Sequence, residues 1–404
     1  MFISLRFSDI NGVLKEVLVS EKKFREVREK GVWFDGSSIL GLVRRYESDM
    51  RLKPDERSRF RLNDLEVYFC NVYQGDKPYE GDPRFILQKV LSEIENLGLK
   101  ALTSGELEFY LLRNDEKIDK GSYFDVSPRD KAHEVKLKIV EMLSRAGIEW
   151  DTGHHEVGPG QNEIDIKYDD ALLTSDKILL TKNVVKLVAE SLGLKATFMP
   201  KPFEGLPGNG MHLHFSLWKG EKNLFYDEKQ KLSQTAKFFI GGILKHVKAI
   251  TAIVNPTINS YKRLGEFEAP KYIYWGSKNR DALIRIPDII HPSSARIEFR
   301  ASDPSSNPYL AFSVLLKAGL DGIKNEISPQ EALEEDIYES GAYKSLDTLP
   351  STLQEAIDEL KKDELLKNLL GPTFEKFVEL KEAEVRDFLK KNITDWEFEK
   401  YFDV

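Results

Sequence analysis

Four short stretches of the chain place charged side chains on one face of a β-strand and apolar side chains on the other. They cover residues 106–109, 163–166, 212–215 and 296–300. Because strand side chains alternate between the two faces, each stretch directs its acidic, histidine or arginine side chains to one side. Several such strands predict an antiparallel sheet with one face on a hydrophobic core and the other lining a polar cavity.

The same alternation also occurs in half-buried strands whose polar face meets only water. Two features favour a binding cavity. Histidine is scarce, with seven in the chain, yet His154, His155, His212 and His214 are concentrated in two of the candidate segments. The polar positions also carry residue types that bind hard or borderline metals and phosphate, rather than the Lys, Thr and Ser of an ordinary wet face.

The composition is that of a globular protein with room for two domains or one large one. Of the 404 residues, 41% are hydrophobic, which is ample for a packed core. The net charge is -8 and the Lys and Arg residues are dispersed, so nucleic acid is not an expected partner. The single cysteine, Cys70, lies in an apolar run and is expected to be a buried thiol.

The sequence carries no sign of export or membrane insertion. Its first residues, Met-Phe-Ile-Ser-Leu-Arg-Phe, lack the basic and long apolar regions of a signal peptide. No apolar run approaches the length of a membrane span. We therefore expect a cytoplasmic protein that does not associate with membranes.

Turn residues at 79–84 mark the expected domain boundary. Asp82 and Pro83 offer an N-cap and a first helical position to the amphipathic run that follows. Residues 1–81 are predicted to form a small β-rich domain, and residues 82–404 a larger α+β domain without regular alternation of strands and helices. Helical periodicity is present at 85–97, 172–192, 235–253, 309–324 and 353–389.

The acidic residues of the strands suit a divalent metal site. Glu106 and Glu108 share one strand face, and two neighbouring carboxylates repel each other unless a cation lies between them. The same set includes His155, Glu156, Glu163, His212 and Glu298. Many oxygen ligands with limited imidazole favour magnesium or manganese over structural zinc, and the number of acids favours a paired-metal site.

Five arginines fall within one short region of this net acidic chain. They are Arg263, Arg280, Arg285, Arg296 and Arg300. Each by itself would be read as a surface salt-bridge donor, but two of them share a strand face with Glu298. Guanidinium groups clamp carboxylates and phosphates with paired hydrogen bonds, so a phosphate site beside a metal is the better interpretation.

Metals held by acids beside an arginine cluster indicate phosphoryl transfer, in which the protein mainly positions groups and neutralises charge. The glycine-bearing loops at 35–38, 158–160 and 205–212 match no Walker or dinucleotide fingerprint. The loop at 205–212 leads into the strand of His212 and permits close approach of a ligand to the backbone, although an ordinary tight turn is equally compatible. No arrangement of Ser, His and Asp or of Cys and His asks for a nucleophilic mechanism.

Taken in order, the motifs resemble glutamine synthetases of the bacterial and archaeal type I class, over nearly the whole chain. The matching segments are Phe34-Asp-Gly-Ser-Ser38, Glu47-Ser-Asp-Met50, Glu80-Gly-Asp-Pro-Arg84, Gly105-Glu-Leu-Glu-Phe109, His154-His-Glu-Val157 with Gly160-Gln-Asn-Glu163, residues 201–214, residues 255–263, residues 279–287, and Arg296-Ile-Glu-Phe-Arg300 with Asn307-Pro-Tyr-Leu310. The resemblance implies a β-grasp-like N-terminal domain. It also implies a catalytic domain whose curved antiparallel sheet forms an active-site barrel surrounded by helices.

The family joins ammonia to glutamate at the expense of ATP, through a γ-glutamyl phosphate intermediate. The resemblance implies two or more Mg²⁺ or Mn²⁺ ions in each active site. Glu108, Glu156 and Glu163 resemble the ligands of one cation, and Glu106, His212 and Glu298 those of the second. Glutamate would be bound by Arg263, Arg300 and Gly208, and the ATP phosphates by Arg280, Arg285 and Arg296, with His214 and Ser216 toward the nucleotide.

The resemblance also assigns the groups around ammonia. Asp35 resembles the acid that takes a proton from bound ammonium, with Ser38 and Tyr123 beside it, and Glu268 resembles the flap acid that excludes water from the intermediate. In this family the N-terminal domain of one subunit completes the active site of its neighbour. The resemblance therefore implies a homo-oligomer, a dodecamer of two hexameric rings.

The chain departs from the family pattern at three places. Residues 263–268, here called the flap segment, are one residue shorter than the family's flap and lack its proline, so Glu266 is a second candidate for the flap acid. Pro207 stands where the family usually has an asparagine that helps to bind glutamate. The residues around Tyr338 do not match the surface tyrosine motif that some members adenylylate, so this modification is not expected.

Two other functions remain open from the sequence. Relatives with the same metal and ATP residues ligate glutamate to amines or polyamines, although Asp35, Ser38 and Tyr123 favour ammonia, because a small cation needs negative and polar neighbours. A non-catalytic paralogue acting as a structural or regulatory oligomer is the third reading. The intact metal and arginine sets argue against it.

Overall fold

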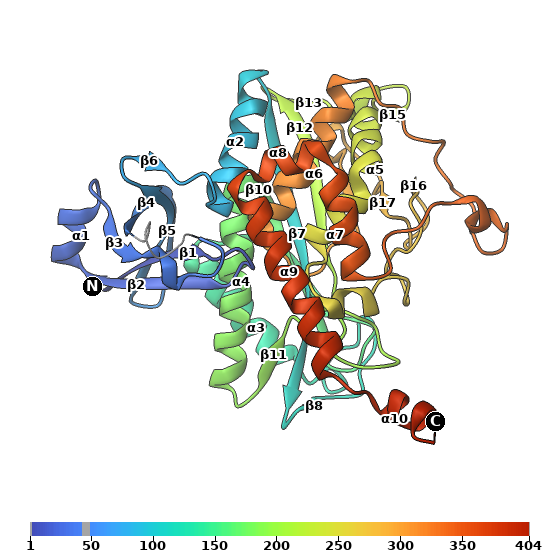
Figure 1. Ribbon diagram of the computed structural model, residues 1–404, viewed down its shortest axis with the longest axis horizontal. Coiled ribbons are helices and arrows are strands. Elements are labelled where there is room, and N and C mark those ends of the chain that lie inside the picture. The colour runs from blue at the N-terminus through green and yellow to red at the C-terminus, as the bar shows by residue number, and fades with distance from the viewer. Residues whose placement is uncertain (1, 43–48, 404) are drawn as a thin grey trace.

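The computed structural model describes residues 2–42 and 49–403, and two large β-sheets lie one in each part of the described chain (Figure 1). Glu47 and Ser48 of the second family motif lie outside the described residues. The first sheet is formed by β1 (Phe2–Ser8), β2 (Leu14–Ser20), β3 (Val32–Asp35), β4 (Asp49–Leu62), β5 (Leu65–Gln74) and β6 (Lys77–Pro78). Its order is β2-β1-β5-β4-β3, with β6 on β5, and β1 runs parallel to β5 between antiparallel neighbours.

The short helix α1 (Glu21–Val27) follows β2 and closes one side of this sheet. Ser20 caps the helix by accepting a hydrogen bond from the Lys23 amide, which satisfies a free N–H of the first turn. Phe24 of α1 is buried, and its ring lies 4.8 Å from that of Tyr68 on β5. The expected small β-rich N-terminal domain is therefore present, and it has the β-grasp arrangement. Cys70 is fully buried in its core, as its apolar setting predicts.

The second sheet carries the strands that the sequence singles out. Its main path is β16 (Trp275–Gly276), β17 (Ile284–Arg285), β18 (Ile297–Phe299), β12 (Met211–Lys219), β7 (Lys100–Arg113), β10 (Gln161–Asp170) and β9 (Trp150–His155). Three short strands pair with it at the side, namely β8 (Glu116–Lys117), β11 (Lys195–Thr197) and β13 (Lys222–Asn223), while β14 (Tyr226–Asp227) and β15 (Lys231–Leu232) form a separate hairpin. All neighbouring strands of the main path are antiparallel except β16 and β17.

Alternation along these strands separates a core from a cavity, as predicted. On β7, Leu107 and Phe109 point into the hydrophobic core, and Glu106 and Glu108 point to the other face. Met211, Leu213 and Phe215 on β12 belong to the same core. The fold is thus α+β, with a curved antiparallel sheet. Charged groups lie on its polar face, because burying them on the core face would cost their hydration free energy.

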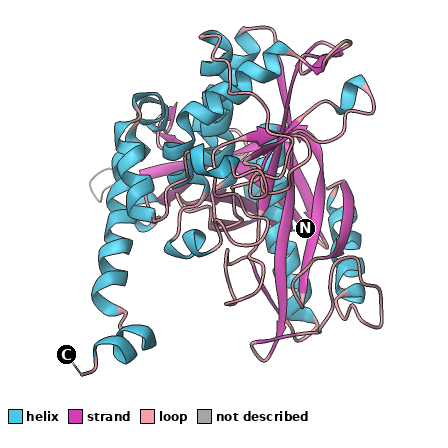
Figure 2. Cartoon of the chain, turned by 90° about the vertical axis from the view of Figure 1, so that its right-hand side faces the viewer, coloured by secondary structure: helices cyan, strands magenta, loops and turns pink. Residues whose placement is uncertain are grey.

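Helices cover the apolar face of the large sheet (Figure 2). The expected runs at 85–97, 172–192, 235–253 and 309–324 correspond to α2 (Pro83–Asn96), α4 (Ala171–Ser191), α5 (Gln234–Val254) and α6 (Pro308–Lys324). Asp82 caps α2 and Pro83 is its first residue, as predicted. The helix α3 (His133–Ala146), whose periodicity was not recognised in the sequence, packs against α4.

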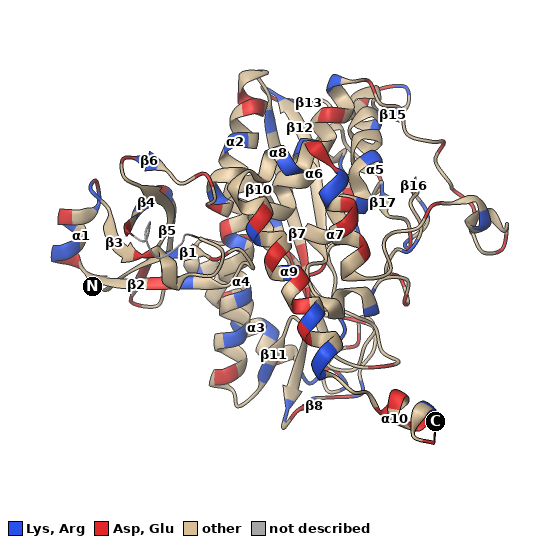
Figure 3. Cartoon of the chain, in the orientation of Figure 1, with Lys and Arg blue, Asp and Glu red and all other residues tan. Residues whose placement is uncertain are grey.

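The single helical run expected at 353–389 is wrong. It is divided into α7 (Leu353–Lys362), α8 (Glu364–Leu370) and α9 (Pro372–Lys391), followed by α10 (Asp395–Tyr401). Asp363 ends α7 in an extended conformation and caps α8, and Gly371 has a φ of 51° that most residues avoid. Acidic and basic residues are interspersed along the outer helices such as α9 (Figure 3). Within the described residues, no helix is both long and apolar enough to cross a membrane.

The two sheets are joined by a buried ionic network around Arg84 of α2. Its Nη2 lies 3.0 Å from an oxygen of Asp55 on β4 and 3.0 Å from an oxygen of Asp176 on α4. The same nitrogen donates to Ser58 over 2.8 Å, and Tyr309 of α6 donates to Asp176. The network therefore ties the N-terminal domain to the helices that support the large sheet.

Substituting Arg84 tests this tie. Arg84→Met should lower the free energy of unfolding by about 3–5 kcal/mol, because Asp176 would remain buried without its cation. Arg25→Met, which breaks the exposed pair with Glu21, should change the free energy of unfolding far less, because water screens an exposed ion pair. Urea denaturation of both variants provides the comparison, and equal losses would show that the buried network has no special role.

Candidate active site

The polar face of the large sheet lines two adjoining cavities. The larger, of about 570 Å³, is lined by side chains from β7, β9, β10, β12 and β18 and by the flap segment. The smaller, of about 430 Å³, lies toward Ser216 and Arg296. Glu106 and Asp165 line both cavities, so these two acids mark where they meet.

Strand register brings the predicted metal ligands together. Glu106 of β7 lies opposite His212 of β12, and His214 lies opposite Glu298 of β18. His212 Nδ1 is 2.9 Å from Glu106 Oε2 and 3.8 Å from Glu298 Oε1. Ligand atoms of Glu106, His212 and Glu298 all lie within 4.8 Å of one another, which is the spacing of a single cation site.

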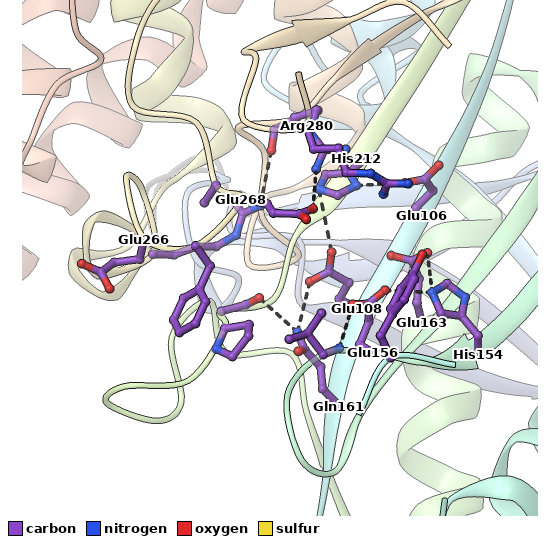
Figure 4. Close-up of a pocket in the computed structure, with 18 of the residues that line it drawn as sticks. Glu106, Glu108, His154, Glu156, Gln161, Glu163, His212, Glu266, Glu268 and Arg280 are labelled. Atoms are coloured by element: carbon purple, nitrogen blue, oxygen red, sulfur yellow. Dashed lines mark hydrogen bonds and ion pairs between the residues drawn. The ribbon is translucent and has the colours of Figure 1, made fainter. Parts of the chain in front are cut away.

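The other predicted set forms two overlapping groups rather than one. Glu108 and Glu163, opposite each other on β7 and β10, lie with His212 in a group of potential ligands, and Glu163 also lies with His154 and Glu156 (Figure 4). His154 Nε2 is 2.8 Å from Glu156 Oε1 and 3.7 Å from Glu163 Oε1. Glu163 belongs to both groups and therefore connects Glu108 with Glu156. His154 is a further potential ligand that was not among the predicted ones.

His155 does not face the cavity, contrary to its place in the predicted ligand set. Its Nε2 is 3.2 Å from Asp119 Oδ1, and its Nδ1 is 2.6 Å from the Glu156 carbonyl oxygen. Asp119 Oδ1 also accepts a hydrogen bond from the Gly160 amide over 2.7 Å. Because the sheet alternates, adjacent histidines point to opposite sides, and His155 fixes the backbone that carries Glu156. Gly121 is required beside it, since a Cβ there would lie 2.5 Å from His155 Nε2.

Burial and mutual repulsion dominate the protonation of the acids. Desolvation raises the pKa of Glu163 well above its usual range, and the charges of Asp165 and Glu106 add to the effect. Burial also acts to raise the pKa of Glu106, but His214 and His212 outweigh it and hold that pKa well below its usual range. The acids of the cavity thus carry more negative charge than the neighbouring cationic side chains balance. A bound divalent metal would compensate for the excess.

The arginines lie along the same cavity wall. Arg300 and Arg285 both contact Glu298, the latter with Nη1 2.6 Å from Glu298 Oε2. Burial acts to raise the pKa of Glu298, but Arg300 and His214 outweigh it and lower that pKa. Arg263 is buried and donates from Nη1 to the Ala301 carbonyl over 2.8 Å.

Close packing fixes the backbone beside the arginines. Gly208 must be glycine, because a Cβ would lie 2.4 Å from the Pro200 carbonyl oxygen and 2.8 Å from Arg263 Cγ. Arg280 and Tyr123 also line the larger cavity, and the centre of the Tyr123 ring lies 5.4 Å from that of the His154 ring. Desolvation raises the pKa of Tyr123, and Arg280 partly opposes this.

The smaller cavity contains the residues that the resemblance places toward a nucleotide. His214 Nε2 is 2.7 Å from Glu106 Oε1, and Arg296 Nε donates to His214 Nδ1 over 3.3 Å. Ser216 accepts a hydrogen bond from Trp218 Nε1 over 2.9 Å. Glu106 therefore links the two cavities through one histidine on each side.

Asp35 and Ser38 are not among the residues that line either cavity. Asp35 ends β3 and caps the short turn at 36–38, where Ser38 Oγ donates to Asp35 Oδ2 over 3.1 Å. Figure 1 shows β3 in the N-terminal domain, away from β16 and β17 of the large sheet. Within one chain these two residues are therefore separated from the groups they were expected to accompany.

Gln161 and Asp165 also line the larger cavity, although the sequence assigned neither of them a role in binding. Gln161 Nε2 donates to Glu108 Oε2 over 3.2 Å and to the Gly208 carbonyl over 3.1 Å. It therefore connects a predicted metal ligand to the loop at 205–212, here called the glycine loop. Asp165 stands two positions after Glu163 on β10 and therefore faces the same way. The two-residue period predicted the direction of Asp165, and it extends to Gln161, two positions before Glu163.

Comparison with known proteins agrees with this geometry. The model of the glutamine synthetase catalytic domain matches residues 80–401, and that of the glutamine synthetase β-grasp domain matches residues 1–75. The chain belongs to the glutamine synthetase family. Glutamine synthetase of Pyrococcus abyssi is 46% identical over 100% of this chain and 97% of its own length, and that of Thermotoga maritima is 45% identical over 99% and 96%.

Solved structures share the fold of this glutamine synthetase family member over its whole length. A GmaS–ADP complex has a TM-score of 0.93 at 33% identity, covering 100% of this chain and 97% of that one. A cryo-EM structure of Plasmodium falciparum glutamine synthetase has a TM-score of 0.89 at 26% identity, covering 99% and 95%. The family uses ATP and depends on divalent metal ions, and the donor set fits such ions because it is mainly carboxylate with one central imidazole.

Asp165 provides a test of the repulsion between the acids. Desolvation and Glu106 raise its pKa from 3.8 to about 6, so the folded state holds a proton that the unfolded chain has released. Stability should therefore fall as pH rises from about 4 to about 6, and the penalty should persist above that range. Asp165→Asn removes this titration. As the pH rises through this range, the free energy of unfolding of the variant should increase relative to that of the wild type by up to about 3 kcal/mol, at about 1.4 kcal/mol per pKa unit.

Thermal unfolding at several pH values in the presence of a chelator measures this gain. Asp151→Asn, at an exposed position on β9, is the matched control and should show no such trend. A stability difference for Asp165→Asn that does not change between pH 4 and pH 7 would contradict the proposed repulsion.

Proposed function

We infer that this protein catalyses the ATP-dependent ligation of ammonia to L-glutamate, giving L-glutamine, ADP and phosphate through γ-glutamyl phosphate. The observation that carries this conclusion is one cavity in which acids spaced for cations stand beside a row of arginines. Family membership over the full chain supports the same reaction. Phosphoryl transfer needs this combination because charge develops on oxygens that the protein must neutralise.

The acids would hold two or more Mg²⁺ or Mn²⁺ ions. In this proposal Glu106, His212 and Glu298 hold one ion, and Glu108, Glu156 and Glu163 hold another. Bound metal supplies charge neutralisation at the phosphate oxygens and orients them for transfer. The Gly210 amide donates to Glu108 Oε2 over 2.8 Å, and Gln161 donates to the same oxygen, so the ligand is held in place before any ion binds.

The arginines would bind the substrates. Arg263 is assigned to the α-carboxylate of glutamate and Arg300 to its side-chain carboxylate, with Gly208 supplying backbone contact. Arg280, Arg285 and Arg296 are assigned to the phosphates, and His214 and Ser216 to the nucleotide. The support is positional, because Arg263 and Arg300 line the larger cavity and Arg296, His214 and Ser216 line the smaller one.

Glu268 is the better candidate for the flap acid. Its Oε2 lies 3.6 Å from Arg300 Nη2, whereas Glu266 Oε2 lies 3.9 Å from Lys201 and points away from the cluster of acids (Figure 4). Only an acid on the inner side of the flap can exclude water from an acyl phosphate and contact the incoming amine.

The active site would be shared between subunits. Asp35 and Ser38 lie outside the cavities of their own chain, which supports their action, beside Tyr123, in a neighbouring subunit. We propose a dodecamer of two hexameric rings, with the chain divided into domains 1–81 and 82–404 and the enzyme acting in the cytoplasm. The oligomer brings the N-terminal domain of one subunit to the cavity of the next.

Phosphate release from ATP with glutamate and magnesium tests the reaction. Ammonium should support turnover, and small amines and polyamines at equal concentration should support at least about tenfold less, because a pocket with polar and negative groups favours a small cation. Glutamine formation should match phosphate release. Turnover only with an amine would replace this proposal by the glutamate–amine ligase reaction.

Mixing two inactive variants tests the shared site. Asp35→Ala and Glu298→Gln, co-expressed with different tags at equal amounts, should recover about one quarter of wild-type activity in mixed oligomers, since that fraction of interfaces combines two intact halves. Mixing Asp35→Ala/Glu298→Gln double-variant chains with wild-type chains should also give about one quarter. A site contained within one chain predicts no recovery in the first mixture and about one half in the second.

A further inference from the structure

The flap segment has an unusual backbone for a loop that covers an active site. Gly265 has a φ of 81°, and Phe267 has a φ of 54° although its side chain is bulky and 55% exposed. Non-glycine residues with bulky side chains avoid this region, so surrounding contacts must hold Phe267 there. Ala269 directly follows the segment and is bonded to it, since the Gly265 amide donates to the Ala269 carbonyl over 3.2 Å and the Ala269 amide donates to the Glu266 carbonyl over 3.1 Å.

Lys201 contacts both the flap segment and the loop at 205–212. Its side chain is only 8% exposed, and its Nζ donates to the Leu206 carbonyl over 2.7 Å. The same ammonium lies 5.0 Å from the centre of the Phe267 ring and 3.9 Å from Glu266 Oε2. The Lys201 ammonium thus contacts the glycine loop and two consecutive residues of the flap segment.

The backbone of Lys201 is held by the segment that leads into the flap. Its amide donates to Asn259 Oδ1 over 2.7 Å, and Asn259 Nδ2 donates back to the Lys201 carbonyl over 3.0 Å. Asn259 belongs to the 3₁₀ turn η3 (Ile258–Lys262), which ends at Arg263 where the flap begins. Lys201 is therefore positioned independently of the flap tip and can act as a fixed point for it.

We propose that Lys201 is a positioning residue that holds the flap over the cavity through the Phe267 ring and the Glu266 carboxylate, leaving Glu268 to face the reacting groups. This proposal rests on the proposed function, because it concerns the flap of that reaction. An ammonium largely removed from water is attracted to an aromatic face and to a carboxylate more strongly than at an exposed site. The proposal also gives separate tasks to the two acids of the shortened flap.

Hydrogen exchange of the substrate-free enzyme tests the contact directly. Lys201→Met keeps the length of the side chain and removes its charge, so the amides of Gly265 and Ala269 should exchange roughly fivefold faster. Lys201→Arg retains a cation and should exchange at nearly the wild-type rate. Lys117→Met is the matched control, because it removes a similar contact in which Lys117 Nζ lies 4.8 Å from the centre of the Phe203 ring.

Partition of the intermediate supplies the functional readout. A loosened flap admits water, so Lys201→Met should release more phosphate per glutamine formed at limiting ammonium, with kcat affected less than this ratio. Phe267→Leu should reproduce both effects to a smaller extent without altering Lys201, which guards against a folding defect in the lysine variant. Glu268→Gln should raise the ratio without accelerating flap exchange.

The two readouts separate the possible outcomes. Unchanged flap exchange in both Lys201→Met and Phe267→Leu would overturn the proposal, even if the wild type makes glutamine. Faster exchange in both, with a wild type that makes no glutamine, would support the contact and refute the proposed function instead. If exchange is equally fast in Lys201→Met and in Lys201→Arg, the shape of the side chain rather than its charge matters, and the proposal would also be overturned.

Discussion

Repulsion between buried carboxylates is the constraint on which the candidate site depends. Glu106, Glu108, Glu163 and Asp165 face one another across β7 and β10, and burial together with the charges of the neighbouring acids raises the pKa of Glu163. A fold keeps such a cluster only if other interactions supply the missing stability. Here the opposite face of the same strands does so by burying Leu107, Phe109 and their neighbours in the large core.

Other contacts hold the elements on both sides of this sheet in place. The Arg84 network connects the N-terminal domain to the helices behind the sheet. His155 and Asp119 hold the backbone of Glu156 from behind. In front, the flap and the glycine loop meet at Lys201. Positioning of this kind matters because the reaction depends on placed charge rather than on a nucleophile of the protein.

Much of the fold followed from local pattern. Alternation along β7, β10, β12 and β18 correctly predicted which face is buried, and capping at Asp82 correctly predicted where α2 begins. The long helical run at 353–389 was wrong, because periodicity continues through Asp363 and Gly371 while the backbone does not. The site was predicted less completely, since Gln161 contacts Gly208, which is distant in sequence, and strand direction decides that His154 rather than His155 lies beside the acids.

The sequence by itself determined the types of side chain that share a strand face, because a period of two is a local property of the backbone. It therefore predicted acids, histidines and arginines around one cavity. Only the tertiary structure decided how these groups divide into sites, which of two adjacent histidines faces the cavity, and which of two flap acids turns inward. Those choices depend on strand register and on contacts such as Lys201 with Phe267, which join residues far apart in the chain.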